Sequence, residues 1–143
     1  MGIRLKRGAI YQFNCDLDGK TNTDATKPKH YFVVLSDETY NERGNSFLCV
    51  GTSSNTSQHY SVQFIMEDFE NWSEAMNHKE SERNRYEPFE KLSQVYILID
   101  KVCRVRQEDI LFRGHGLDKP LMLRPEKYKQ LIERIRDFMY LDS

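Results

Sequence analysis

Short apolar runs separated by polar, turn-rich segments limit most strongly how this chain can fold. Each run is four or five residues long and rich in strand-forming side chains, a length typical of β-strands and too short for a stable helix. Residues 60–64 alternate apolar and polar side chains, which predicts a further, half-buried strand. The chain is therefore predicted to be mainly β. Besides residues 60–64, the predicted strand segments lie at residues 9–13, 31–35, 47–50, 95–99 and 102–106.

Asp100 and Lys101 separate the last two runs and form either a tight turn or a bend in one long strand. Residues 37–45 are predicted to be a polar connection. Residues 67–90 are charged and show no clear period, so we expect an exposed excursion with one short helix around residues 74–83.

An amphipathic helix is predicted at about residues 125–140. Pro125 suits the first helical position, Glu126 suits the positive end of the helix dipole, and apolar side chains follow at helical spacing. This apolar stripe must pack against the strands. About five or six strands followed by one helix favour a small curled sheet or barrel closed by that helix, in one domain over residues 1–143.

Composition excludes several classes of protein. The length of 143 residues suits a single compact domain. A mean hydropathy of -0.73, with no apolar run near 18 residues, predicts no membrane span. The basic start lacks the apolar stretch of a secretory signal, and three cysteines without CxxC spacing fit a reduced compartment. We expect a cytoplasmic protein that does not interact with membranes.

Charge is distributed unevenly along the chain. Residues 1–36 carry a net charge of +3, residues 37–90 carry −7, and residues 91–143 carry +3. If the two basic thirds share a face, they can attract a polyanion. The alternative is that these blocks are solvated loops.

Motifs for nucleotides, metals and serine nucleophiles are missing from the sequence. Neither GxxxxGK[ST] nor GxGxxG occurs, and no GxSxG is present. The four histidines have no partner at i+3 or i+4, so we predict neither a metal site nor a cofactor.

Two polar groups precede or follow predicted strands. Lys27, Lys29 and His30 stand before the most hydrophobic strand, where they can meet a phosphate and where His30 can transfer protons. Residues 52–54, Thr-Ser-Ser, end another strand and can hold a phosphate oxygen. The alternatives are a basic loop with a half-buried histidine and an ordinary Ser/Thr-rich turn.

The order of these segments resembles the PemK/MazF family of toxins. The family typically begins with an RGDIY-like strand, which is similar to RGAIY at residues 7–11. Its VVVLS strand followed by YN is similar to residues 29–41, and its strand ending in threonine or serine is similar to residues 48–53. Its LLDQIRTIDK stretch and its terminal helix are similar to residues 92–101 and 123–128. The resemblance covers most of the chain except residues 67–90.

The resemblance implies an SH3-like β-barrel of about five to seven strands that forms homodimers. It further implies the toxin of a type II toxin–antitoxin pair, which binds a cognate antitoxin protein. Members of the family are metal-independent, sequence-specific endoribonucleases that cleave single-stranded RNA such as mRNA. In this chemistry the 2′-hydroxyl of the RNA attacks the neighbouring phosphate, and the protein supplies a base, an acid and positive charge.

The family's site residues carry over only in part. Its catalytic arginine falls on His30, with Lys29 adjacent, and its catalytic threonine or serine falls on Ser53, with Thr52 and Ser54 as register alternatives. The acid of the DQ motif falls on Ser93, so that carboxylate is missing, while the glutamine is kept as Gln94. The spacing from Gln94 to Asp100 is one residue longer than in the family. The residues predicted to bind RNA are Lys27, Ser54, Gln94, Asp100 and Lys101.

Two functions from different classes stay open at this point. In the first, a ribonuclease uses His30 as acid or base, Lys29 for charge, and Ser53 or Thr52 to position the scissile group. In the second, a non-catalytic barrel grips a protein target, as gyrase-poisoning toxins of related fold do, or binds RNA without cutting it. A barrel domain of unrelated role is the third possibility.

Overall fold

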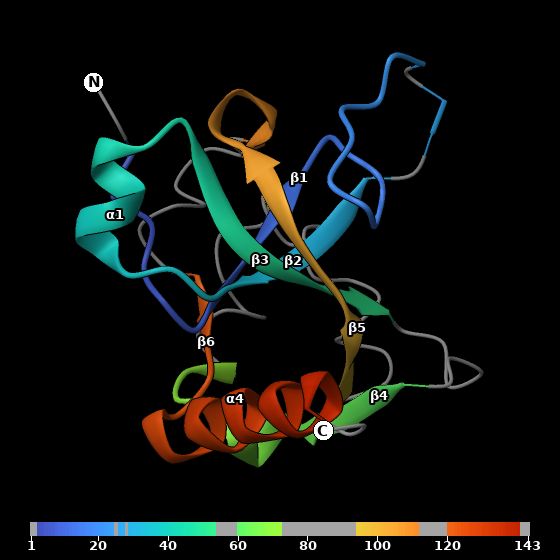
Figure 1. Cartoon of the computed structure of the whole chain (residues 1–143). Helices are drawn as coiled ribbons and strands as arrows, with labels where there is room; N and C mark the ends of the chain where they lie inside the picture. The colour runs from blue at the N-terminus through green and yellow to red at the C-terminus, as the bar shows by residue number, and fades with distance from the viewer. Residues whose placement is uncertain are drawn as a thin grey trace.

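The computed structural model describes residues 3–24, 26–27, 29–53, 60–72, 94–111 and 120–140. Within these ranges, six strands form one antiparallel sheet in the order β4-β5-β3-β2-β1-β6. The sheet curls into a half-barrel, and helix α4 lies beneath it beside β4 (Figure 1). The predicted small curled barrel with a C-terminal helix is confirmed. The strands are β1 (Ala9–Phe13), β2 (His30–Val34), β3 (Ser46–Ser53), β4 (Ser61–Ile65), β5 (Gln94–Arg106) and β6 (Leu121–Met122), and the helices are α1 (Glu38–Arg43) and α4 (Pro125–Met139).

The sheet separates two apolar cores. The helix-side core lies between the sheet and α4 and includes Val33, Val50 and Ile97 from the strands, with Leu131 and Ile135 from α4. The loop-side core lies on the opposite face. Both cores exist because alternate side chains of a strand point to opposite faces, and here both faces carry apolar residues. The loop-side core contains Leu5, Ala9, Tyr11, Phe13, Cys15, Phe32, Val34, Phe47, Cys49, Val105 and Ile110.

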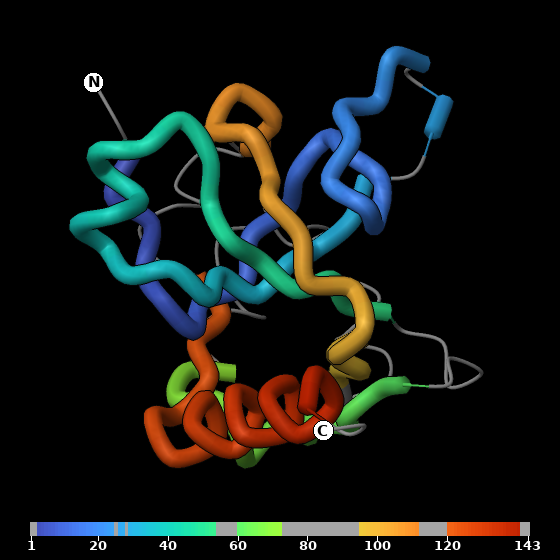
Figure 2. Tube along the Cα trace, viewed as in Figure 1, coloured from blue at the N-terminus to red at the C-terminus, as the bar shows by residue number. Residues whose placement is uncertain are grey.

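A bend in β5 gives the sheet its curl. Val50 of β3 pairs with Val102, whereas Thr52, two residues further along, pairs with Ile97. The extra residues of β5 between these pairs form a bulge, and bulges bend strands and increase their twist. The trace of β5 changes direction sharply in Figure 2. The last two apolar runs therefore belong to one long strand, and Asp100 and Lys101 lie at its bend.

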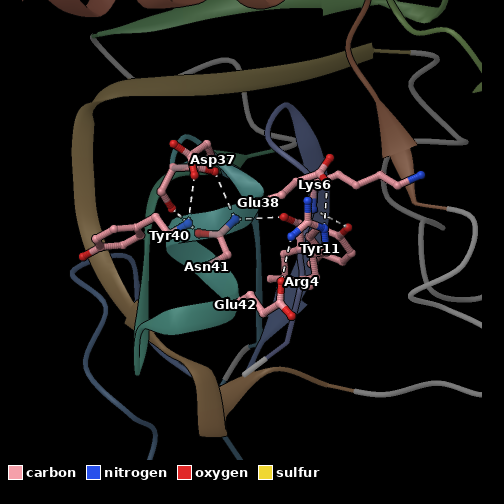
Figure 3. Close-up of polar contacts among 10 residues, drawn as sticks. Arg4, Lys6, Tyr11, Asp37, Glu38, Tyr40, Asn41 and Glu42 are labelled. Carbon is pink, nitrogen blue, oxygen red and sulfur yellow. Dashed lines mark hydrogen bonds and ion pairs between the residues drawn. The ribbon is translucent and has the colours of Figure 1, made fainter. Parts of the chain in front are cut away.

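Helix α1 corrects the prediction that residues 37–45 are only a polar connection. Asp37 caps it by accepting a 2.8 Å hydrogen bond from the backbone N–H of Tyr40. The fully buried Asn41 donates to the carbonyl oxygens of Leu5 and Ser36. This helix has no apolar stripe and is tied to the N-terminal segment through polar contacts (Figure 3). Hydrophobic periodicity gives no sign of such a helix.

The start of the 67–90 segment is not an exposed excursion. Phe69 and Trp72 are buried in the helix-side core, with ring centroids 5.3 Å apart. Asn71 fastens this stretch to β6 by donating to the carbonyl oxygen of Pro120 and accepting from the N–H of Met122. The remainder, including the short helix expected around residues 74–83, lies outside the described residues.

None of the described helices combines the length and the apolar character that crossing a bilayer requires.

Replacement of Leu131 tests the packing of α4. Leu131 is fully buried in the helix-side core, so Leu131→Ala should lower the free energy of unfolding by about 2–5 kcal/mol. Met139→Ala on the same helix is the matched control, because Met139 is 67% exposed and its loss should change stability by less than about 0.5 kcal/mol. Urea denaturation measures both, and equal effects would contradict the packing described.

Candidate functional site

His30 faces the loop side of the sheet. It begins β2 and pairs directly with Phe13 of β1. Cross-strand partners point to the same face, and Phe13 belongs to the loop-side core. The imidazole is therefore on the face opposite α4, at the end of the strand, where it is half-buried.

Ser53 lies on the same face. It ends β3 and pairs with Tyr96 of β5, whose neighbours Val95 and Ile97 both point into the helix-side core. Tyr96 and Ser53 consequently point to the loop side.

His30 and Ser53 lie at neighbouring ends of β2 and β3. The register of this strand pair ends at Phe32 and Gly51, and His30 and Ser53 each lie two residues beyond that pair. The hydroxyl of Thr52 donates a 2.9 Å hydrogen bond to the carbonyl oxygen of Tyr31, which keeps the strands together at the intermediate position. Two residues that sequence analysis selected separately thus lie on one face, at the ends of neighbouring strands.

Thr52 has a different environment from Ser53. It pairs with Ile97 on the helix side, is 4% exposed, and uses its hydroxyl for the bond to Tyr31. Of the three register alternatives, Ser53 shares a face with His30, and Ser54 lies outside the described residues. The geometry assigns Thr52 to the structure of the strand pair.

The remaining predicted site residues have different positions. Lys101 lies on the loop-side face at the bend of β5, its Cβ 3.7 Å from where a Cβ on Gly51 would be. Asp100 is exposed beside it, Lys29 is half-buried next to His30, and Lys27 is exposed in the preceding loop. Gln94 begins β5, where its backbone pairs with Ile65 of β4. It lies two residues before Tyr96, the partner of Ser53.

A loop at residues 14–22 covers this face, and sequence analysis did not include it in the site. Its ends are joined by a bridge between Cys15 and Thr21. Leu17 packs on the bend, because its Cδ2 is 2.8 Å from where a Cβ on Gly51 would be. A Cβ on Gly19 would lie 2.2 Å from the carbonyl oxygen of Arg104, so this loop touches the backbone of β5. The loop contains Asp18-Gly19, a dipeptide typical of turns.

The electrostatics of His30 favour its neutral form. Burial lowers the pKa of the imidazole, and the carboxylate of Asp16 in the 14–22 loop opposes that change. An imidazole with a lowered pKa is neutral at pH 7 and can accept a proton.

The three cysteines are packing groups. Cys49 pairs directly with Cys103 across β3 and β5, and Cys15 belongs to the same loop-side core. Burial raises the pKa of Cys15 to about 12 and that of Cys103 to about 11. Thiols with such pKa values stay protonated near neutral pH and are poor nucleophiles.

Neither similarity to known proteins nor a metal site among the described residues assigns a function to this chain. Neither the models of known protein families nor the curated protein sequences match this chain. Within the described ranges, no group of three or more His, Cys, Asp or Glu side chains is arranged to hold a metal ion. The functional interpretation rests on the residues at the ends of β2 and β3.

The contact between the 14–22 loop and β5 can be tested with two glycine substitutions. Gly8 and Gly19 share a φ of +87°, so alanine at either position should cost about 1–2 kcal/mol through backbone strain. Gly19→Ala should cost clearly more, because its Cβ also meets the Arg104 carbonyl, whereas at Gly8 the nearest atom is the Tyr128 ring at 3.4 Å. Urea denaturation compares the variants. Equal losses of stability would contradict the close approach.

Proposed function

We propose that this protein is a metal-independent endoribonuclease acting on single-stranded RNA, the toxin of a type II toxin–antitoxin pair. The observation that supports it most is that His30 and Ser53 lie on one face of the sheet, at the ends of the neighbouring strands β2 and β3. These are the two positions that the resemblance to PemK/MazF toxins marks as catalytic.

Each residue has a specific role in the proposed reaction. The neutral imidazole of His30 accepts the proton of the RNA 2′-hydroxyl, whose oxygen attacks the adjacent phosphorus. The bond from phosphorus to the 5′-oxygen breaks and the leaving oxygen takes up a proton from solvent water, which leaves a 2′,3′-cyclic phosphate and a 5′-hydroxyl. The hydroxyl of Ser53 donates to a phosphate oxygen, and the ammonium groups of Lys29 and Lys101 stabilise the negative charge that develops.

The departures from the family pattern favour a site rebuilt around histidine. An arginine at position 30 would bind phosphate through two parallel hydrogen bonds, whereas His30 brings proton transfer and leaves charge stabilisation to lysine. The carboxylate missing at Ser93 removes one candidate base, and His30 takes that role in the proposal. The homodimer and the cognate antitoxin belong to the same proposal and rest on the resemblance, whereas the proposed cytoplasmic location rests on the composition.

Cleavage of RNA in the presence of EDTA tests the proposal. The purified protein should cut long single-stranded RNA at discrete positions and leave cyclic-phosphate ends. His30→Ala should lower the cleavage rate by about 10²–10⁴-fold, the usual contribution of a general acid or base. Lys129→Ala, an exposed site on α4 across the sheet, is the control and should keep the wild-type rate.

Two results would contradict the ribonuclease proposal in different ways. Cleavage at the wild-type rate by His30→Ala would remove His30 from the mechanism. Intact RNA, together with growth arrest on expression of the wild type, would favour the non-catalytic toxin that grips a protein or an uncut RNA.

A further inference from the structure

The end of the sheet where β3 begins and β5 finishes presents charged side chains to solvent. Arg104 and Arg106 of β5 pair with Leu48 and Ser46 of β3. Val105, between the two arginines, belongs to the loop-side core, so Arg104 and Arg106 point to the opposite face. Helix α4 lies under the other end of the sheet (Figure 1), and both arginines and Leu48 are exposed. This part of the face is therefore accessible.

The guanidinium of Arg104 is held in place by neutral groups. Its Nη1 donates hydrogen bonds of 2.7 Å to the hydroxyl of Tyr40 and 3.3 Å to the hydroxyl of Ser46. Within the described residues, no carboxylate pairs with Arg104. Both bonds use Nη1, so the N–H groups of Nη2 and Nε can donate to another acceptor. A fixed guanidinium with its charge uncompensated suits a phosphate.

Tyr40 extends this surface onto α1. It is 42% exposed, and in Figure 3 its ring points away from Arg4. The acids of α1 lie on that other side, where Glu38 and Glu42 pair with Arg4 at 3.2 and 2.7 Å. Arg43 follows Tyr40 by three residues, is exposed, and so shares its side of the helix. The side of α1 that adjoins β5 thus carries an aromatic ring and a cation, and its acids are paired elsewhere.

An open cavity of about 440 Å³ adjoins the second arginine. Ile3, Asn45, Arg106, Gln107 and Glu108 line it. Amide side chains can donate to and accept from the edge of an unpaired base, and an apolar wall suits its face. Arg106 forms an ion pair with Glu108, and both side chains are more than half exposed. Exposed pairs of this kind contribute little to stability, so a phosphate can compete for the guanidinium.

We propose that the arginine face, formed by Tyr40, Leu48, Arg104 and Arg106, binds single-stranded RNA outside the cleavage site. The proposal deepens the ribonuclease function and rests on it. Charge complementarity selects an anionic partner, because Arg104 has no acid beside it. The exposed ring of Tyr40 beside that charge favours nucleic acid over an acidic protein, since unpaired bases stack on aromatic side chains while phosphates meet arginine.

The arginine face is separate from the proposed catalytic residues. It lies on the side of the sheet opposite His30. Leu48 and Ser53 are five residues apart on β3, at most roughly 17 Å in an extended strand. A long RNA can therefore occupy both places, and the arginine face adds affinity for RNA without touching the scissile phosphate.

Binding of a fluorescently labelled single-stranded RNA with 2′-O-methyl groups tests the proposal. This RNA lacks the attacking hydroxyl, so fluorescence anisotropy measures binding without cleavage. Arg104→Gln should weaken binding and reduce the slope of log affinity against log salt by about 0.7, the value for one phosphate contact on a single strand. Arg4→Gln is the matched control, because it makes the same charge change at a guanidinium already bound to Glu38 and Glu42. Equal changes of slope in both variants would reduce the effect to net charge and overturn the proposal.

Two substitutions of Tyr40 test stacking on its ring. Tyr40→Ala should lower the affinity for the same RNA by about 5–150-fold, the usual cost of losing one stacked base. Tyr40→Phe keeps the ring and loses only the hydroxyl that accepts from Arg104, so it should retain most of the affinity. Urea denaturation confirms that both variants are folded. Equal losses of affinity in the two variants would overturn stacking on Tyr40.

The results distinguish this surface from the ribonuclease function. Unchanged RNA affinity in Arg104→Gln and Tyr40→Ala would overturn the arginine face and leave the cleavage test of His30 unaffected. Weakened binding in both, with no RNA cleavage by the wild type, would overturn the ribonuclease function and support the RNA-binding surface. Displacement of the labelled RNA by polyglutamate as effective as that by unlabelled RNA would indicate an acidic protein partner and overturn the assignment to RNA.

Discussion

The close packing at Gly51 is the constraint on which the rest of the structure depends. At Gly51, Leu17 of the 14–22 loop lies over β3 and Lys101 of β5 lies beside it. A Cβ on Gly51 would be 2.8 Å from the Leu17 side chain. The register between β3 and β5 also shifts here, which bends the sheet. A residue without a side chain allows the loop to seat directly on the bend. The covering loop and the ends of β2 and β3 take their relative positions from this contact.

The two cores stabilise the two faces of the bent sheet. The helix-side core joins α4, β4 and the strand ends, while the loop-side core fixes the first part of the chain and the 14–22 loop. Because the site lies where the loop-side core ends, His30 is desolvated enough to have a lowered pKa and still remains half-exposed. The same packing that builds the fold thereby sets the protonation state on which the proposed chemistry depends.

Local patterns predicted β1 to β5 and α4 but not the two-residue strand β6, and tertiary contacts determined what those patterns missed. The strand runs and the helix beginning at Pro125 could be predicted because hydrophobic period and end signals are local properties of sequence. Helix α1 could not, since the buried amide of Asn41 and the carbonyl of Leu5 hold it from outside. For the site, sequence analysis selected His30 and Ser53 but left Thr52 equivalent to Ser53. Strand register distinguishes these two residues, and composition carries no information on register.

A double-mutant cycle on the rate of RNA cleavage tests most directly whether His30 and Ser53 form one site. The variants are His30→Ala, Ser53→Ala and their combination, with Thr52→Val replacing Ser53→Ala in a parallel control cycle. Residues of one site should be non-additive, with a coupling of about 0.5–3 kcal/mol in activation free energy. We predict such coupling for Ser53 and additive effects for Thr52, whose hydroxyl bonds to the carbonyl oxygen of Tyr31 in the strand pair. Additive effects of His30 and Ser53 would show that the two residues act independently and would contradict the site described.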